Sequence, residues 1–422
     1  MTSLNLQRNS EVFYSTVDLI NGGEVTSMTP SNTWKLEVLA GFAASSSAAT
    51  QDITSLESGI TPDRSQQRFN TAINPVDWNF QVYLRPTGVN TGAAADGTAA
   101  GTTSTGNVKP VADWFMWQAL TSNTSPSDGT SDQSVWVTGG KLNTTNTAAG
   151  TGSHSTRSNF STAQENHLYF KLDNVIYQVS NATVNQATVD AGIEEIATVT
   201  WTGFGTTMKE LTGTPRDNAV SVFGGILNNG SSTTANTSAV TMDLEAAYHP
   251  FNQMNVAAAT GTNSFIKNRL SAIEFKHTPA GESEVTYTFP VTALSLEYNN
   301  NITYLTPEEL ANLNEPIGQF TGTRGVTGSA TMYLRAGDSE SAQFLRNISE
   351  DSRTSIAQAS SANLIIGGPT APYVAFNLPA AQFEFPQLAV EDVISMSVNF
   401  MGQEPNATKG GGGEITIFAA KS

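Results

Sequence analysis

The tripeptide Tyr-Leu-Arg occurs twice in this sequence, beginning at Tyr83 and again, 250 residues later, at Tyr333. A tripeptide can recur by chance, so its meaning depends on whether the neighbouring segments also recur, in the same order. Three further pairs of segments do: 51–62 with 300–310, 68–74 with 319–325, and 189–205 with 386–402. Matched segments in the same order indicate that one structural unit occurs twice in the chain.

The spacing between matched segments also makes sense along the chain. The offset is near 250 for the first pairs and 197 for the last, because the first half carries about 53 additional residues. That half contains a Thr/Gly/Ser-rich insertion, whose composition cannot bury enough apolar area to order itself alone. The sequence therefore predicts four parts: a first domain at 1–208 with the insertion at about 87–160, a linker at 209–262, a second domain at 263–405, and a Gly hinge with a C-terminal strand or arm at 406–422.

Strand patterns dominate both halves. In 76–85 the apolar residues alternate with polar ones, which is typical of a half-buried antiparallel strand; they are Val76, Trp78, Phe80, Val82 and Leu84. Helical patterns are few and short, at 111–122, 306–313 and 340–348. The expected fold class is mainly β, with two tandem antiparallel β-sandwich or barrel domains, each with one or two short helices.

Charge restricts the partners. Among 422 residues, 37 are Asp or Glu and 20 are Lys or Arg, which gives a formal net charge of −17. Tight binding to nucleic-acid phosphates depends on Lys and Arg, so this balance argues against a protein that grips nucleic acid. The sequence shows neither a signal-peptide pattern nor an apolar run long enough to cross a bilayer, so we expect no membrane partner and synthesis in the cytoplasm.

No pattern for catalysis or for cofactor or metal binding stands out. The chain has no cysteine, and its four histidines, at 154, 167, 249 and 277, have no metal-ligand spacing. The Ser-His pair within 150–155 lies in a Ser-rich loop without the strand–turn–helix context of a nucleophile elbow. Paired carboxylates suited to glycoside hydrolysis stay open, because their separation in space decides that chemistry. We expect no enzyme, no cofactor and no metal.

Several segments resemble a known family. "LNLQRNSEVF" at 4–13, "NNITYLTPEEL" at 300–310 and "GQFTGTRGVTGSATMYLR" at 318–335 are similar to segments of the tail tube (major tail) proteins of tailed bacteriophages. The resemblance implies a small β-sandwich or barrel beside a helix, and subunits that form rings stacked into a tube with one sheet facing the lumen. Two copies in one chain, and the long Thr/Gly/Ser loop, depart from the common single-domain form.

The resemblance implies a structural virion protein of the phage tail, made in the host cytoplasm, that forms an acidic conduit for DNA. If single-copy relatives form six-domain rings, a fused pair gives that ring as a homotrimer with pseudo-sixfold symmetry. Its partners would be further copies of itself, and tail sheath, baseplate and tail terminator proteins, while DNA passes without specific binding. Two alternatives stay open: a tube-end or baseplate ring protein of the same fold, and an extracellular adhesive or carbohydrate-binding β-sandwich protein.

Six residues are candidates for function because they occur at equivalent places in the two halves. The acidic pairs Glu194/Glu195 and Glu391/Asp392 precede the last strong strand of each half and could line a lumen or mediate ring contacts; they could equally be solvated residues at a strand end. Arg85 and Arg335 follow the repeated Tyr-Leu. Each could bind a carboxylate of a neighbouring subunit or lie in solvent.

Overall fold

The computed structural model describes most of the patterned sequence. The described residues are 10–20, 33–53, 67–86, 111, 113–120, 136–137, 141–143, 166–172, 175–211, 266, 268–279, 283–306, 314–354, 360–368, 372–389, 393–404 and 414–420. Most of the predicted insertion and linker, helix 306–313 beyond its first residue, and the Gly hinge therefore lie outside them. The predicted domain boundaries stay a prediction.

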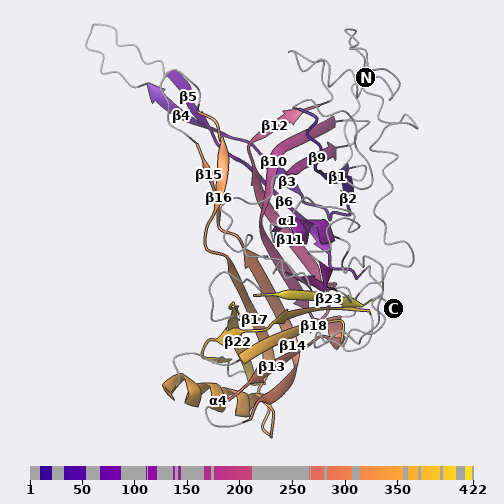
Figure 1. Cartoon of the computed structure of the whole chain (residues 1–422), viewed down its shortest axis with the longest axis vertical. Coiled ribbons are helices and arrows are strands. Elements are labelled where there is room, and N and C mark those ends of the chain that lie inside the picture. Colours follow the sequence, from indigo (N-terminus) through magenta and orange to yellow (C-terminus); the bar gives the residue numbers. More distant parts are fainter. Residues whose placement is uncertain are drawn as a thin grey trace, which may run out of the picture.

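One antiparallel sheet runs through both halves of the chain, and we call it the continuous sheet (Figure 1). In order its strands are β3 (Ala43–Ser45), β6 (Val76–Tyr83), β11 (Thr198–Gly205), β10 (Val175–Gly192), β14 (Val285–Asn299), β17 (Gly325–Tyr333) and β22 (Ser395–Gly402). Two short strands, β20 (Ala381–Phe383) and β21 (Gln387–Ala389), pair with the outer edge of β22.

Two further sheets cover one face of the continuous sheet. The first contains β2 (Thr33–Leu36), β1 (Ser10–Ser15), β9 (Asn166–Leu172), the beginning of β10, and β12 (Thr207–Glu210). The second contains β7 (Trp136–Val137), β8 (Lys141–Asn143), β23 (Thr416–Ala420), β19 (Tyr373–Leu378), β18 (Ser360–Ile366), β13 (Ala272–His277) and the beginning of β14. The long strands β10 and β14 thus each belong to two sheets.

Two hairpins extend from the body on the same side (Figure 1). They are β4 (Ala48–Ile53) with β5 (Gln67–Ile73), and β15 (Ile302–Leu305) with β16 (Gly318–Thr321). They meet where the amide of Ile73 donates a 2.8 Å hydrogen bond to the carbonyl of Asn314. The helices among the described residues are α1 (Trp114–Leu120), α4 (Ser341–Thr354) and the short 3₁₀ helix η3 (Asn268–Leu270).

The period-two pattern of 76–85 is confirmed. Val76, Trp78, Phe80 and Val82 of β6 are buried, and the polar residues between them face the other way. A strand that is apolar on one face needs a cover on that face, and the covering sheets together with α1 supply it. The mainly β class with antiparallel sheets and few helices is confirmed.

Helix α1 lies inside the molecule, between the sheets, because almost all of its described side chains are apolar. Phe115 stacks on Trp34 at 5.1 Å, and Trp117 meets Trp201 edge-on at 4.9 Å. The end of the helix is held by Asn300, whose amide donates to the carbonyl of Leu120 at 2.6 Å. A side chain of the second half thus satisfies a terminal carbonyl of a helix in the first half.

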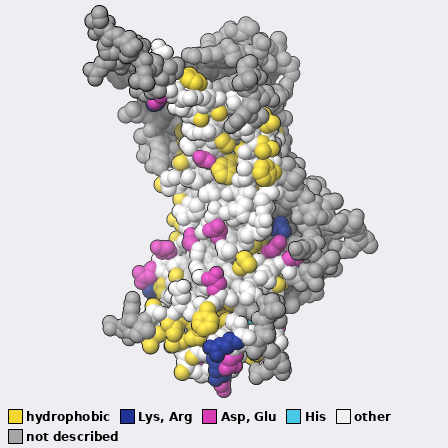
Figure 2. All heavy atoms as spheres, turned by 90° about the vertical axis from the view of Figure 1, so that its left-hand side faces the viewer, with side chains coloured by type: hydrophobic (Ala, Val, Ile, Leu, Met, Phe, Trp, Pro, Cys, Tyr) yellow, Lys and Arg dark blue, Asp and Glu magenta, His cyan; other side chains and the backbone are white. Residues whose placement is uncertain are grey.

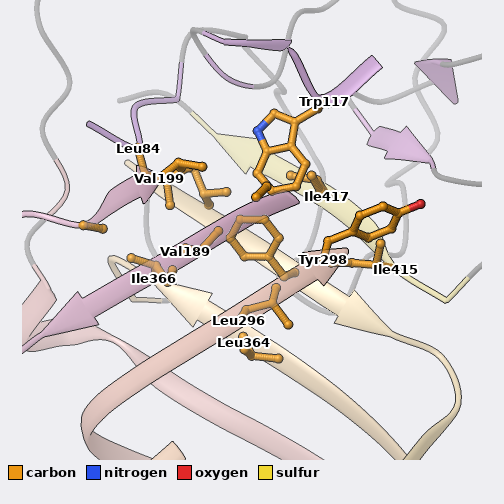
Figure 3. Packing of buried hydrophobic residues seen from close by; sticks show 14 of the residues in the cluster. Leu84, Trp117, Val189, Val199, Leu296, Tyr298, Leu364, Ile366, Ile415 and Ile417 are labelled. Atoms are coloured by element: carbon orange, nitrogen blue, oxygen red, sulfur yellow. The ribbon is translucent and has the colours of Figure 1, made fainter. Parts of the chain in front are cut away.

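The two halves share a core. Trp117 of α1 also lies 5.8 Å from Phe376 of β19, and Figure 3 shows side chains of both halves converging there, among them Val189, Leu296 and Ile417. Burial of apolar area between the halves fixes them relative to each other. The two halves therefore act as one unit with a fixed relative orientation.

The predicted helix at 340–348 is confirmed and is longer than expected, as α4. Its Phe344 is fully buried and stacks on Phe275 at 5.0 Å, with Phe383 at 5.4 Å. This aromatic cluster holds α4 against the second covering sheet, which closes the core of the second half.

Candidate functional site: the open face of the continuous sheet

The second face of the continuous sheet is exposed across both halves of the chain. Its side chains alternate along each strand with the buried ones, so the sequence pattern that builds the core also fixes this surface. We define the open face by these residues: Asp77, Asn79, Gln81, Thr198, Thr200, Thr202, Gln186, Thr188, Asp190, Ser295, Glu297, Thr327, Ser329, Thr331, Ser397 and Asn399.

Its chemistry is mainly polar. The residues that define the open face have hydroxyl and amide side chains with three carboxylates, Asp77, Asp190 and Glu297, and none of them is Lys or Arg. The exposed apolar side chains of Met401 and Tyr333 lie on the same face, near the strand ends. Figure 2 shows this side of the molecule, with uncharged polar side chains, groups of hydrophobic ones, scattered acidic ones and few basic ones. Such a surface offers no cation to a phosphate, and its carboxylates repel a polyanion.

The polar side chains are held in place by one another. The amide of Gln81 donates to the hydroxyls of Thr198 and Thr200 at 3.1 and 3.3 Å, across the strand pair β6–β11. Across β10–β14, Ser295 donates to a carboxylate oxygen of Asp190 at 2.7 Å. These cross-strand hydrogen bonds occupy donors that could otherwise bind a passing ligand. The open face therefore offers fewer hydrogen-bond donors to such a ligand, in addition to offering it no cation.

The predicted acidic residues lie elsewhere or outside the described residues. Glu194 and Glu195 are exposed in the turn after β10, at one end of the continuous sheet, and Glu194 lies 3.4 Å from Arg269. Glu391 and Asp392 lie outside the described residues. The carboxylates of the open face were missed, although the polar positions of the alternating segment 76–85 contained the signal.

The two candidate arginines differ. Arg85 forms an ion pair with Glu37 of the same chain, and its side chain is only 11% exposed. Arg335 is exposed at the end of β17, where its backbone amide donates to Ser341 Oγ at 2.7 Å and so anchors the start of α4. A role between subunits stays a prediction for both.

The continuous sheet has two unlike free edges among the described strands. One edge is β3 with the adjoining bridge from Val38 to Val82, and the other is β20 with β21. The second edge carries the exposed apolar side chains of Phe385 and Leu388. Unpaired strand edges with apolar side chains are sites for adding another strand.

A serine, a histidine and an aspartate lie in line in the second half. Ser360 Oγ is 2.7 Å from His277 Nδ1, and His277 Nε2 is 2.8 Å from a carboxylate oxygen of Asp351. All three residues are less than a tenth exposed, and burial lowers the pKa of His277. These contacts join β13, β18 and α4, and we read them as structural. Among the described residues no group of His, Asp and Glu is placed to hold a metal ion. No described helix has the length and apolarity that crossing a bilayer requires.

Comparison with known proteins bears on this geometry. The chain is 27% identical over 414 residues to Tail tube protein pb6 of Escherichia phage T5, an alignment that covers 94% of this chain and 72% of that protein. The chain resembles a phage tail tube protein. Because the alignment covers 94% of the chain, the similarity spans both halves. No family model matches the sequence.

Among solved structures, the baseplate of the anti-feeding prophage, determined by cryo-EM with sixfold symmetry, matches 36% of this chain and 94% of that chain. The identity is 12% and the TM-score is 0.24.

Proposed function

We propose that this chain is a structural protein of a phage tail, in which three copies form a ring, rings stack into a tube, and the open face lines a conduit for DNA. The resemblance to a tail tube protein supports the class of function. An open face without Lys or Arg supports the conduit, because DNA can slide along a surface that does not bind its phosphates.

One observation carries the ring. Within the continuous sheet, the strand of the first half that lies beside the second half, β10, pairs with the neighbouring strand of the second half, β14, from Gln186 opposite Asn299 to Gly192 opposite Ala293. This junction extends one sheet across two similar units, edge to edge. In the repeat, the free edge at β3 corresponds to the edge of β14, and the free edge at β20–β21 corresponds to that of β10. A second junction of this kind, formed between chains, would continue the sheet until it closes into a ring.

The strand register supports the duplication on which this ring rests. Tyr83 lies opposite Thr198 in β6–β11, and Tyr333 lies opposite Ser395 in β17–β22. Adding the sequence offsets of 250 and 197 to the first pair gives the second pair. This agreement between the sequence offsets and the strand register supports the repeat inferred from short matches.

A pair of close contacts supports it too. In the first half, Trp78 of β6 covers Gly203 of β11, and in the second half Phe400 of β22 covers Gly328 of β17. These are equivalent positions with the aromatic residue and the glycine exchanged. Either arrangement fills the same space, which is what two diverged copies of one fold can do.

The test is the mass of an isolated ring. We expect native mass spectrometry of the purified protein to give rings of three chains, each of 44.7 kDa. Negative-stain micrographs should show six similar lobes per ring and rings stacked into tubes. A ring of six chains would contradict the fused-pair geometry, and a protein that stays monomeric at high concentration would contradict the function. Rings that never stack would favour the tube-end alternative.

A further inference from the structure

The exposed apolar side chains of the described residues are not scattered. Of the thirteen large ones, twelve lie in three places: the β20–β21 edge and the two ends of the continuous sheet. Exposed apolar side chains gathered in this way mark interaction surfaces. The edge belongs to the ring proposed above, so the two ends need their own explanation.

The two ends of the continuous sheet differ: the hairpins lie at one end and the turns before β11 and β22 at the other. The corresponding strands of the two halves have the same orientation. The hairpins leave the sheet where Val76 lies opposite Gly205 and where Val326 lies opposite Gly402. The turns before β11 and β22 lie at the other end of the same strands, beyond Tyr83 and Tyr333. Because β6 has eight residues, the ends are about 25 Å apart along the strand.

We name the patches by their residues. The hairpin end consists of Phe69, Leu305, Ile317 and Phe320. The loop end consists of Ile193, Ile196, Leu270, Tyr333, Val393 and Ile394. Each patch has members at repeat-equivalent positions, since Phe69 matches Phe320 in the first and Ile196 matches Val393 in the second. All of these side chains are between 39% and 73% exposed.

We propose that the hairpin end of each chain docks on the loop end of a second copy of this chain in the next ring, and that this contact stacks rings into a tube. The inference rests on the proposed function, which it deepens by naming the stacking surfaces. Two different patches at opposite ends of one molecule make a head-to-tail contact, and copies related by a shift along the strands repeat that contact without closing.

The area available favours contact between rings over contact between single chains. A large side chain buries about 150–250 Å² when it is fully covered. Because the side chains of the two patches are only partly exposed, contact between one pair of chains would bury on the order of 700 Å². A specific interface buries about 1,200–2,000 Å² in total, so one chain pair falls short while three pairs between two rings reach it. The same contacts multiplied around a ring gain further from multivalency.

The experiment uses three variants of the full chain. The hairpin variant carries Phe69→Ser and Phe320→Ser, the loop variant carries Ile196→Ser and Val393→Ser, and the control carries Asn70→Ser and Gln403→Ser at exposed polar positions outside the open face. Because every changed side chain is exposed, thermal melting should match that of the wild type. Sedimentation velocity and negative-stain microscopy then count rings per particle.

We expect tubes from the wild type and the control, and single rings of three chains from the hairpin variant and from the loop variant. Mixing equal amounts of these two variants should give pairs of rings and nothing longer, since only one intact hairpin end meets one intact loop end. Tubes of normal length from either variant, or wild-type rings that stack only when another tail protein is added, would overturn the docking proposal. Failure of the wild type to form rings would instead count against the proposed function.

Discussion

At the scale of single residues, the buried carboxyl of Asp113 lowers the stability of the fold when it is ionised. It precedes α1 and accepts a 2.9 Å hydrogen bond from the indole nitrogen of Trp201. Burial raises the pKa of Asp113 to about 6, and the Trp201 hydrogen bond only partly offsets this. With its folded pKa above the unfolded value, the group stabilises the fold at low pH, and that contribution is lost as pH rises through 6.

We expect Asp113→Asn to raise the free energy of unfolding at pH 8 by up to about 2 kcal/mol, because Asn keeps the acceptor without a charge. The advantage should shrink as the pH falls from 8 to 5. Urea denaturation at several pH values measures it. The matched control is Asp77→Asn on the open face, which should change nothing. A variant less stable than the wild type at pH 8 would contradict the assignment.

Two glycines, one in each half of the chain, have no room for a side chain. A Cβ at Gly203 would lie 2.0 Å from the carbonyl oxygen of Thr183, and one at Gly328 would lie 2.4 Å from the ring of Phe400. We expect Gly203→Ala and Gly328→Ala each to cost about 1–3 kcal/mol of stability. Gly325→Ala is the control, because a Cβ there meets nothing within 4 Å. Chemical denaturation compares the three, and equal stability of all three would refute the close packing.

At the scale of elements, the C-terminal strand β23 packs on its own chain. It pairs with β19 and with β8, its neighbourhood includes the fully buried Ile415 and Ile417, and Glu414 forms a 2.8 Å ion pair with Arg324. Deleting 414–422 should therefore lower the stability of the isolated chain by about 4 kcal/mol or more, because two buried isoleucines are lost. Thermal unfolding of dilute protein tests this. A truncated chain that melts normally but no longer assembles would indicate that the strand belongs to a neighbour instead.

Local patterns predicted the elements that alternate clearly or end at a marked position. The strand at 76–85, the ends of β6 and β17 at the repeated Tyr-Leu-Arg, and the helices at 111–122 and 340–348 are all found. The pairing of β10 with β14 was out of reach, because contacts between residues more than a hundred positions apart leave no local signal. The strands β18 and β19 were missed as well, since they are buried on both faces and their sequences show no regular alternation of polar and apolar residues.

The sequence did not indicate the open face. The net charge indicated acidic surfaces in general, and Glu194 and Glu195 stood out because they adjoin along the chain. Asp190 of β10 lies opposite Ser295 of β14, two positions from Glu297. Only the strand order brings the two carboxylates onto one surface. Sequence patterns show which residues face outward; they do not show which outward faces join.

At the scale of the whole molecule, the absence of Lys and Arg from the open face predicts a gain of function. We expect Thr200→Lys with Ser329→Lys, one on each half, to make assembled protein retain short duplex DNA. The binding should weaken as salt rises, because phosphate contacts release counterions. Fluorescence anisotropy of a labelled duplex measures both. Thr200→Gln with Ser329→Gln has similar side-chain length without charge and should not bind; DNA binding by the wild type would contradict the conduit.

The junction between β10 and β14 also has a kinetic consequence. Under the proposed ring, half of the sheet junctions form inside single chains, where the linker holds the two edges at a high effective concentration. Closing a ring then needs three junctions between chains in place of six. It brings together three chains, so the rate of ring nucleation should depend on roughly the third power of protein concentration. Tethering the two units in one polypeptide lets a ring assemble at low subunit concentrations, early in the accumulation of the protein.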